Sequence, residues 1–232
     1  MMNAEAAPPS FYLIPGLGAD ERVFQFLHLR GQVHVLQWLP PQSPDEELPR
    51  YAVRLAEAVP PTQVCWLVGV SFGGLLAQEI GKLRPLARVV LISSFAGPEE
   101  LPWLARLGGA TGLYRILPVQ LFRLLPQAGR WLFSVSSGRD YQLLRQIIRD
   151  TDPRFARWAI GQLLQWPGSQ LPVIRIHGTQ DRLLAAGAAL SQYQLAGGHF
   201  IIVSRAVEIS QILNQLAAEA KAVPQAVENT GQ

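Results

Sequence analysis

Short apolar runs alternate along the chain with stretches in which apolar positions recur every three or four residues. The runs that predict strands span residues 10–15, 32–39, 63–70, 87–93 and 172–177, and a final short strand is predicted at 191–195; the runs at 10–15, 63–70 and 87–93 predict buried strands. The helical spacing predicts helices that open near Asp20 and that span residues 48–59, 72–83 and 202–220. This alternation predicts an α/β fold with a mostly parallel central sheet flanked by helices on both faces.

One long segment interrupts the alternation. Residues 96–167 are rich in Leu, Arg and Trp, show helical spacing without a strand signal, and are divided by Pro and Gly into several short helices. We therefore expect a core formed by residues 10–95 and 168–220, with a helical insertion between them. The small polar stretches at residues 1–9 and 221–232 are predicted to be flexible termini.

The composition fits one compact domain. Of the 232 residues, 49% are hydrophobic and 16% are charged, so the chain can bury a single large core. The net charge of +3 comes mostly from arginines scattered through residues 104–182. Because these arginines form no basic stripe interleaved with aromatic residues, we expect no nucleic-acid site.

The chain has the character of a cytoplasmic protein. Cys65 is the only cysteine, so an intrachain disulfide is impossible, and its apolar neighbours predict a buried side chain rather than a reactive thiol. The first ten residues lack the basic and apolar regions of a signal peptide. No stretch is long and apolar enough to predict a membrane span.

The sequence G-V-S-F-G at residues 69–73 lies between a predicted strand and a predicted helix. It matches the nucleophile elbow G-x-S-x-G, in which a sharp strand-to-helix turn exposes a serine. Gly69 and Gly73 fit this role, because side chains two residues to either side of the serine would collide with the neighbouring elements. We predict that Ser71 is a nucleophile; the alternative is a serine that only caps the helix.

A serine hydroxyl is a weak nucleophile and needs a base. Of the four histidines, His28 is expected on the surface or in packing, and His34 on a strand face or in the core. His177 ends a predicted strand, where a structural hydrogen bond in the turn is the simpler interpretation. His199 follows two glycines in a loop after the last strand, from which it could reach the serine, and we predict it as the base rather than an ordinary loop residue.

The base needs a carboxylate that orients it and stabilises its charged form. Asp181 lies in H-G-T-Q-D, just beyond the strand at 172–177 and therefore at the carboxyl edge of the sheet. Its alternative role is an ordinary turn aspartate. The strand at 87–93 has no carboxylate at its tip, which leaves Asp181 as the predicted acid.

Backbone N–H groups must stabilise the oxyanion that forms during acyl transfer. The amide of Phe72, directly after the serine, and that of Leu17, in the P-G-L-G turn at residues 15–18, are the predicted donors. Gly16 lets this backbone approach the substrate closely. The turn does not match G-x-G-x-x-G, and G-K-[ST] is absent, so we expect no nucleotide site.

Four stretches, I-P-G-L-G-A-D, G-V-S-F-G-G, H-G-T-Q-D and G-G-H-F, occur in this order. Together they resemble the α/β-hydrolase superfamily, in particular its small bacterial members with a helical cap, over residues 11–217. The chain order Ser71, Asp181, His199 is that of the superfamily's nucleophile, acid and base. The resemblance implies no metal and no organic cofactor. It is incomplete at residues 15–16, where many members have His-Gly, and after Asp181, where many have a proline.

The insertion at 96–167 corresponds to the cap of this superfamily and is expected to shape the pocket over Ser71. Its large apolar residues are expected mostly in its own core and against the sheet, with some facing the pocket: Trp103, Leu107, Leu113, Tyr114, Leu121, Phe122, Trp131, Phe133, Trp158 and Trp166. An apolar lid favours a small hydrophobic acyl substrate. The same residues could instead form a homodimer interface.

These features predict a serine hydrolase that cleaves a carboxylic ester or thioester through an acyl-enzyme. The same triad also fits a carbon–carbon hydrolase or a lyase. A third possibility is a catalytically silent binding module, although none of the three triad residues is missing.

Overall fold

The computed structural model describes residues 8–112 and 126–222. Four of the apolar residues expected in the insertion lie outside this range: Leu113, Tyr114, Leu121 and Phe122. Most of the segments predicted to be flexible termini also lie outside it.

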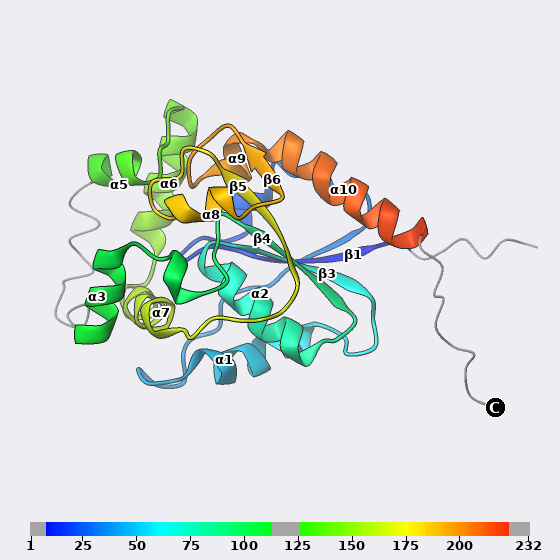
Figure 1. Ribbon diagram of the computed structural model, residues 1–232, viewed down its shortest axis with the longest axis horizontal. Coiled ribbons are helices and arrows are strands. Elements are labelled where there is room, and N and C mark those ends of the chain that lie inside the picture. The colour runs from blue at the N-terminus through cyan, green and yellow to red at the C-terminus, as the bar shows by residue number, and fades with distance from the viewer. Residues whose placement is uncertain (1–7, 113–125, 223–232) are drawn as a thin grey trace, which may run out of the picture.

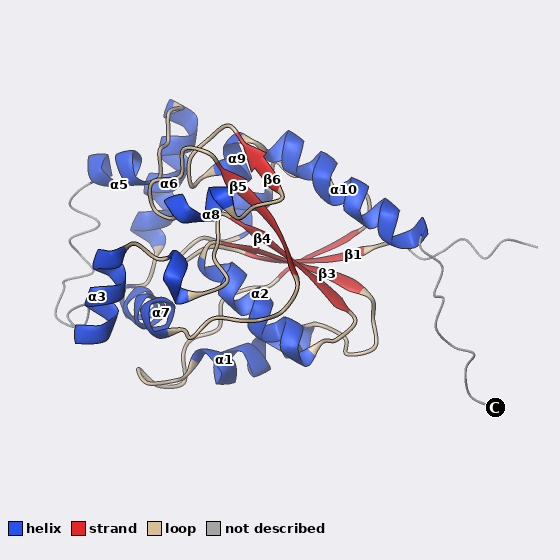
Figure 2. Ribbon diagram, in the orientation of Figure 1, coloured by secondary structure: helices blue, strands red, loops and turns tan. Residues whose placement is uncertain are grey.

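A six-stranded sheet runs through the middle of the described chain (Figure 2). The strands are β1 (Ser10–Ile14), β2 (Gln32–Val35), β3 (Cys65–Val70), β4 (Ala87–Ile92), β5 (Val173–Gly178) and β6 (Tyr193–Leu195), in the spatial order β2-β1-β3-β4-β5-β6. Every neighbouring pair is parallel. The carboxyl ends of all strands therefore meet at one edge, where open α/β sheets bind ligands.

Helices cover both faces of the sheet (Figure 1). On one face, α1 (Leu48–Leu55), its short continuation η2 (Ala56–Ala58) and α2 (Phe72–Leu83) pack against strand residues such as Leu67 and Leu91. On the other face, η1 (Glu21–Phe24), α9 (Ile201–Ser204) and α10 (Ala206–Ala222) pack against residues such as Val68 and Val90. Successive side chains of a strand thus enter opposite cores, which explains the unbroken apolar runs of β3 and β4.

The helical segment between β4 and β5 lies across the carboxyl edge of the sheet (Figure 1). Its described elements are η3 (Pro98–Glu100), α3 (Trp103–Thr111), α5 (Pro126–Leu132), α6 (Gly138–Asp150) and α7 (Pro153–Gln165). Leu144 and Ile147 of α6 join the core on the α10 face, whereas Phe155 and Trp158 of α7 join the core on the α2 face. The segment therefore packs into the hydrophobic cores on both faces of the sheet.

Several apolar side chains of this segment are not in a core. Trp103, Leu107 and Trp131 have exposed fractions of 64%, 52% and 62%, whereas Trp158 and Trp166 are buried. Trp158 and Trp166 thus lie in the core as expected for most of these residues, whereas the first three do not. Helical periodicity identifies an apolar position but does not reveal whether a neighbour covers it.

The sequence-based prediction of the fold is confirmed: a mostly parallel sheet flanked by helices. The predicted helix at 202–220 is divided at Arg205 into α9 and α10, and the opening near Asp20 is a 3-10 turn, followed in chain order by β2. A further short helix, α8 (Ala185–Ala189), lies between β5 and β6. No helix within residues 8–112 and 126–222 has the length and apolar character needed to cross a membrane.

The burial of Cys65 makes a testable prediction. Its side chain is 1% exposed, and burial raises the pKa of its thiol to about 11. The reactive thiolate is therefore scarce at pH 8. We expect no modification of the native protein by a chromogenic thiol reagent, and stoichiometric modification in guanidinium chloride. Rapid labelling of the native protein would contradict this placement.

A matched control is available one residue away. Val64 has an exposed fraction of 55%. The variant Val64→Cys should react in the native state, and so shows that the reagent itself is effective under the same conditions.

Candidate active site

Ser71 occupies a strained turn between β3 and α2. Its backbone has φ 51° and ψ −119°, a conformation that few non-glycine residues adopt. The turn is held from three sides: Ser71 N donates to Ile92 O at 2.9 Å, while Ser71 O accepts from Gly74 N at 2.9 Å and from Ser94 Oγ at 2.7 Å. These bonds position the serine at the start of α2 without using its own hydroxyl. The Ser71 side chain makes no capping hydrogen bond to the first turn of α2.

The glycines around Ser71 allow β1, β3 and α2 to approach one another. A methyl group on Gly73 would lie 2.3 Å from the carbonyl oxygens of both Ile14 and Pro15, and one on Gly69 would lie 2.4 Å from Gly73 O. Backbone atoms cannot move aside as a flexible side chain can. Gly16 differs, because a methyl group there would lie 3.5 Å from Ser71 Cβ, an ordinary contact. A side-chain methyl group could therefore be accommodated at Gly16, next to the serine.

His199 lies between Ser71 and Asp181. Its Nε2 is 2.9 Å from Ser71 Oγ, and its Nδ1 is 2.8 Å from Asp181 Oδ2. A carboxylate can only accept, so Nδ1 carries the proton and Nε2 is the acceptor for the serine hydroxyl. The histidine is 3% exposed and the aspartate 4% exposed. The structure thus brings together the three side chains that the sequence selected.

Asp181 is a buried carboxylate with several contacts. Its Oδ1 accepts from the amides of Leu183 and Leu184, both at 2.9 Å, and its Oδ2 lies near the rings of His199 and His177. Burial acts to raise the pKa of this carboxyl, but the two histidines and the Leu184 amide outweigh it and hold the pKa well below the ordinary aspartate value. The group is therefore ionised throughout the neutral range.

The loop after β1 runs beside the serine. Gly16 O accepts from Ala19 N at 2.9 Å, which closes a tight turn containing Leu17. Phe72 is the first residue of α2, and an N–H at this position has no acceptor within its own helix. The two amides predicted to face an oxyanion therefore come from adjacent elements on the Ser71 side of the sheet edge.

The helical segment between β4 and β5 contacts the loops that carry Asp181 and His199. His199 N donates to Phe133 O at 3.1 Å, and Ser134 Oγ donates to Gln180 O at 2.9 Å. The rings of Phe133 and His199 meet edge to face with centroids 5.3 Å apart. Arg182, next to the acid, donates to Trp131 O at 3.1 Å. Residues 131–134 thus contact the loops that carry Asp181 and His199.

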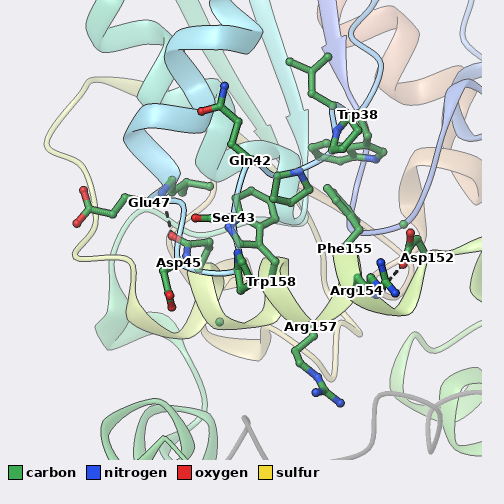
Figure 3. A pocket seen from close by; sticks show the side chains of 18 of the residues that line it. Trp38, Gln42, Ser43, Asp45, Glu47, Asp152, Arg154, Phe155, Arg157 and Trp158 are labelled. Carbon is green, nitrogen blue, oxygen red and sulfur yellow. Dashed lines mark hydrogen bonds between the residues drawn. The ribbon is translucent and has the colours of Figure 1, made fainter.

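A groove of about 1550 Å³ opens between the loop after β2 and α7 (Figure 3). Trp38, Phe155 and Trp158 lie together along it, with charged residues such as Asp45 and Arg157 among the lining. Ser71, Asp181 and His199 are not among the residues that line it. The Trp38 ring meets the buried Phe72 ring at 5.8 Å, so aromatic packing stands between the groove and the serine turn.

Sequence reasoning missed two contributors to this site. His177, expected to make a structural hydrogen bond in its turn, lies instead beside the Asp181 carboxylate with Nε2 3.0 Å from Oδ2. Phe133 was expected among the apolar residues of the insertion, but nothing in its surroundings predicted contact with His199. The spacing of His177 and Asp181, four residues apart at a strand end, was the one available signal for the first of these.

The described residues contain no group of three or more His, Cys, Asp or Glu side chains placed to hold a metal ion.

Comparison with known proteins identifies the family. The model of the alpha/beta hydrolase family matches residues 11–212 of the chain. The chain belongs to the alpha/beta hydrolase family and is a hydrolase by class. No curated protein sequence gives a significant match.

Solved structures share the fold at low sequence identity. A carboxylesterase from the thaumarchaeon Nitrososphaera gargenis is 16% identical with a TM-score of 0.69, over 93% of this chain and 92% of that one. A hydrolase from Oleispira antarctica is 17% identical with a TM-score of 0.69, over 90% and 91%. A putative aryl esterase from Burkholderia cenocepacia is 16% identical with a TM-score of 0.68, over 94% and 92%.

The space around two glycines predicts different effects of their substitution on the free energy of unfolding. Gly73→Ala must push the turn away from the end of β1, so we expect a loss of about 2–3 kcal/mol in the free energy of unfolding. Gly108→Ala, in α3, meets no atom within 4 Å. It should be neutral or stabilise by up to about 1 kcal/mol, since alanine favours helix. Urea denaturation measures both, and equal stabilities would contradict the described packing.

Proposed function

We propose that this protein is a serine hydrolase that cleaves a carboxylic ester or thioester through an acyl-enzyme, with Ser71 as nucleophile, His199 as base and Asp181 as the orienting carboxylate. The observation that carries the proposal is the continuous chain of contacts from Ser71 Oγ to His199 Nε2 at 2.9 Å and from His199 Nδ1 to Asp181 Oδ2 at 2.8 Å. The structural neighbours named as a carboxylesterase and an aryl esterase agree with it.

Acylation follows from the tautomer of His199. Ser71 Oγ attacks the carbonyl carbon of the substrate while its proton passes to Nε2, and the carbonyl oxygen becomes an oxyanion. The imidazolium that forms lies against the ionised Asp181, which stabilises its positive charge. When the tetrahedral intermediate collapses, Nε2 returns the proton to the departing alcohol or thiol, and the acyl group remains on Ser71.

The amides of Leu17 and Phe72 are proposed to stabilise the oxyanion. Donors fixed by the backbone need no rearrangement as charge develops, so they act more strongly than mobile water. Deacylation repeats the sequence with water in place of serine. His199 takes a proton from the attacking water, and the carboxylic acid product leaves as Ser71 Oγ regains its proton.

The helical segment between β4 and β5 is proposed to act as a cap. Its residues 131–134 lie against the acid and base loops, and the Phe133 ring covers one edge of His199. An apolar surface here favours a small hydrophobic acyl group and limits the access of water.

Removal of the nucleophile or the base tests the triad. We expect Ser71→Ala and His199→Ala each to lower kcat on p-nitrophenyl acyl esters by about 10³-fold or more, because no other group can take over the transfer. A fluorophosphonate probe should label the wild type once, at Ser71. Ser169→Ala, in the loop before β5, is the matched serine control and should behave as the wild type. Hydrolysis that persists in Ser71→Ala would exclude the mechanism.

The acid is tested by a substitution that keeps its shape. Asp181→Asn places an amide against His199 Nδ1 and favours the wrong tautomer, so kcat should fall by about 10³–10⁴-fold. Asp140→Asn, at the start of α6, is the control and should change kcat less than about twofold.

Because the pKa of Asp181 is lowered, loss of activity as the pH falls should arise from protonation of His199 and not of the acid. A pH–rate profile of kcat/KM with two proton uptakes on its acid side would contradict this.

A further inference from the structure

Asp181 Oδ2 faces two imidazole rings. His199 Nδ1 lies 2.8 Å from this oxygen, and Nε2 of His177 lies 3.0 Å from the same atom. The two histidines approach from different elements, since His177 is the penultimate residue of β5 and His199 follows β6. Both rings are almost fully buried, with exposed fractions of 1% and 3%. A triad needs only one of them.

The His177 ring is confined where it lies. A methyl group on Gly187 of α8 would come within 2.4 Å of its Cε1 and 3.0 Å of its Nε2, so the ring rests directly on the helix backbone. Nε2 has no well-aligned hydrogen bond among the described residues, although it is so near Oδ2. The contact with Asp181 is therefore mainly electrostatic in this arrangement.

Few other charges face His177. Arg175, two residues earlier on the same face of β5, forms a buried ion pair with Glu100, so these two charges largely cancel. Tyr193 of β6 is paired with Ile176, one residue before His177. The short helix α8 carries only Ala and Gly, and the side chain of Arg182 is exposed and directed to Trp131. Asp181, and His199 through it, are thus the groups that His177 can influence.

A carboxylate oxygen this close fixes the protonation of the ring. An unprotonated Nε2 would bring its partial negative charge to 3.0 Å from the charged Oδ2 and be repelled, so we infer that Nε2 carries a hydrogen. That hydrogen attracts part of the negative charge on Oδ2. The same oxygen serves His199 Nδ1, and charge attracted by one ring is less available to the other.

We propose that His177 is a positioning residue that acts on the reaction through Asp181, sharing Oδ2 with His199 and thereby limiting how strongly the acid stabilises the His199 imidazolium. This inference rests on the proposed function, because it needs Ser71 and His199 to carry out the hydrolysis. Among the described residues, the polar contact of the His177 side chain is with Asp181, and no hydrogen bond joins it to Ser71.

The direction of the effect follows from the shared oxygen. Without the His177 N–H, Asp181 offers its full charge to His199, which then keeps its proton up to a higher pH. Since protonated His199 cannot accept the proton of Ser71, the acid side of the kcat/KM profile moves to higher pH. Loss of the electrostatic attraction between this N–H and the carboxylate is expected to move the limb by about half to one pH unit.

The experiment compares pH profiles of two substitutions at one position. His177→Leu removes the donor, and we expect its acid limb to lie about half to one pH unit above that of the wild type. His177→Gln retains an N–H donor and should lie near the wild type. Both are assayed on a p-nitrophenyl ester, with thermal unfolding measured in parallel. An unshifted limb in folded His177→Leu would overturn the proposal, and so would equal shifts in both variants.

A measurement on the wild type covers the case in which His177→Leu does not fold. Histidine labelled with ¹⁵N reports which ring nitrogen carries the proton. A proton on Nε2 of His177 across the active pH range supports the proposal, and a neutral ring protonated only at Nδ1 overturns it. Failure of the proposed function is distinguished separately, because Ser71→Ala would then retain the hydrolysis of the wild type whatever the result at His177.

Discussion

The buried charge of Asp181 is the constraint on which the carboxyl edge of the sheet depends. An ionised carboxylate removed from water is costly unless hydrogen bonds and nearby positive or polar groups surround it. Here the two amides after it and two histidine rings do so. The two amides belong to the turn after β5, His177 belongs to β5 itself, and His199 belongs to the loop after β6. The need to satisfy one carboxylate therefore holds these parts in register, and it places His199 at the distance from which its other nitrogen reaches Ser71.

The serine turn imposes a second constraint of a different kind. A residue with φ of 51° is held there only because its surroundings leave no alternative. The carbonyl of Ser71 is bound twice, and the glycines on either side bring β1 and α2 into contact with the turn. Contacts with the sheet and with α2 thus stabilise the strained backbone, and the hydroxyl is free to bond to His199.

The sequence carried enough information to predict the fold and to select three side chains, Ser71, Asp181 and His199, that lie in contact in the structure. Continuous apolar runs predicted most strands to within a few residues, because strands buried on both faces have no polar positions. The G-x-S-x-G pattern, the glycines before His199 and the strand end before Asp181 located the candidate site. The exposed side of Trp103 and the contact of Phe133 with His199 could not be predicted in this way. Both depend on how the insertion lies over the sheet, which no local periodicity encodes.

The close approach of Gly73 to the end of β1 has a consequence for how such a site can change. The two proposed oxyanion donors, Leu17 and Phe72, follow the ends of the neighbouring strands β1 and β3, and their separation depends on the spacing between those strands, which side chains hardly alter. The relative position of the two proposed donors is therefore determined by the sheet. With the helices across the sheet edge as the proposed cap, changes in substrate preference are expected there, because substitutions in these helices leave the strand spacing intact.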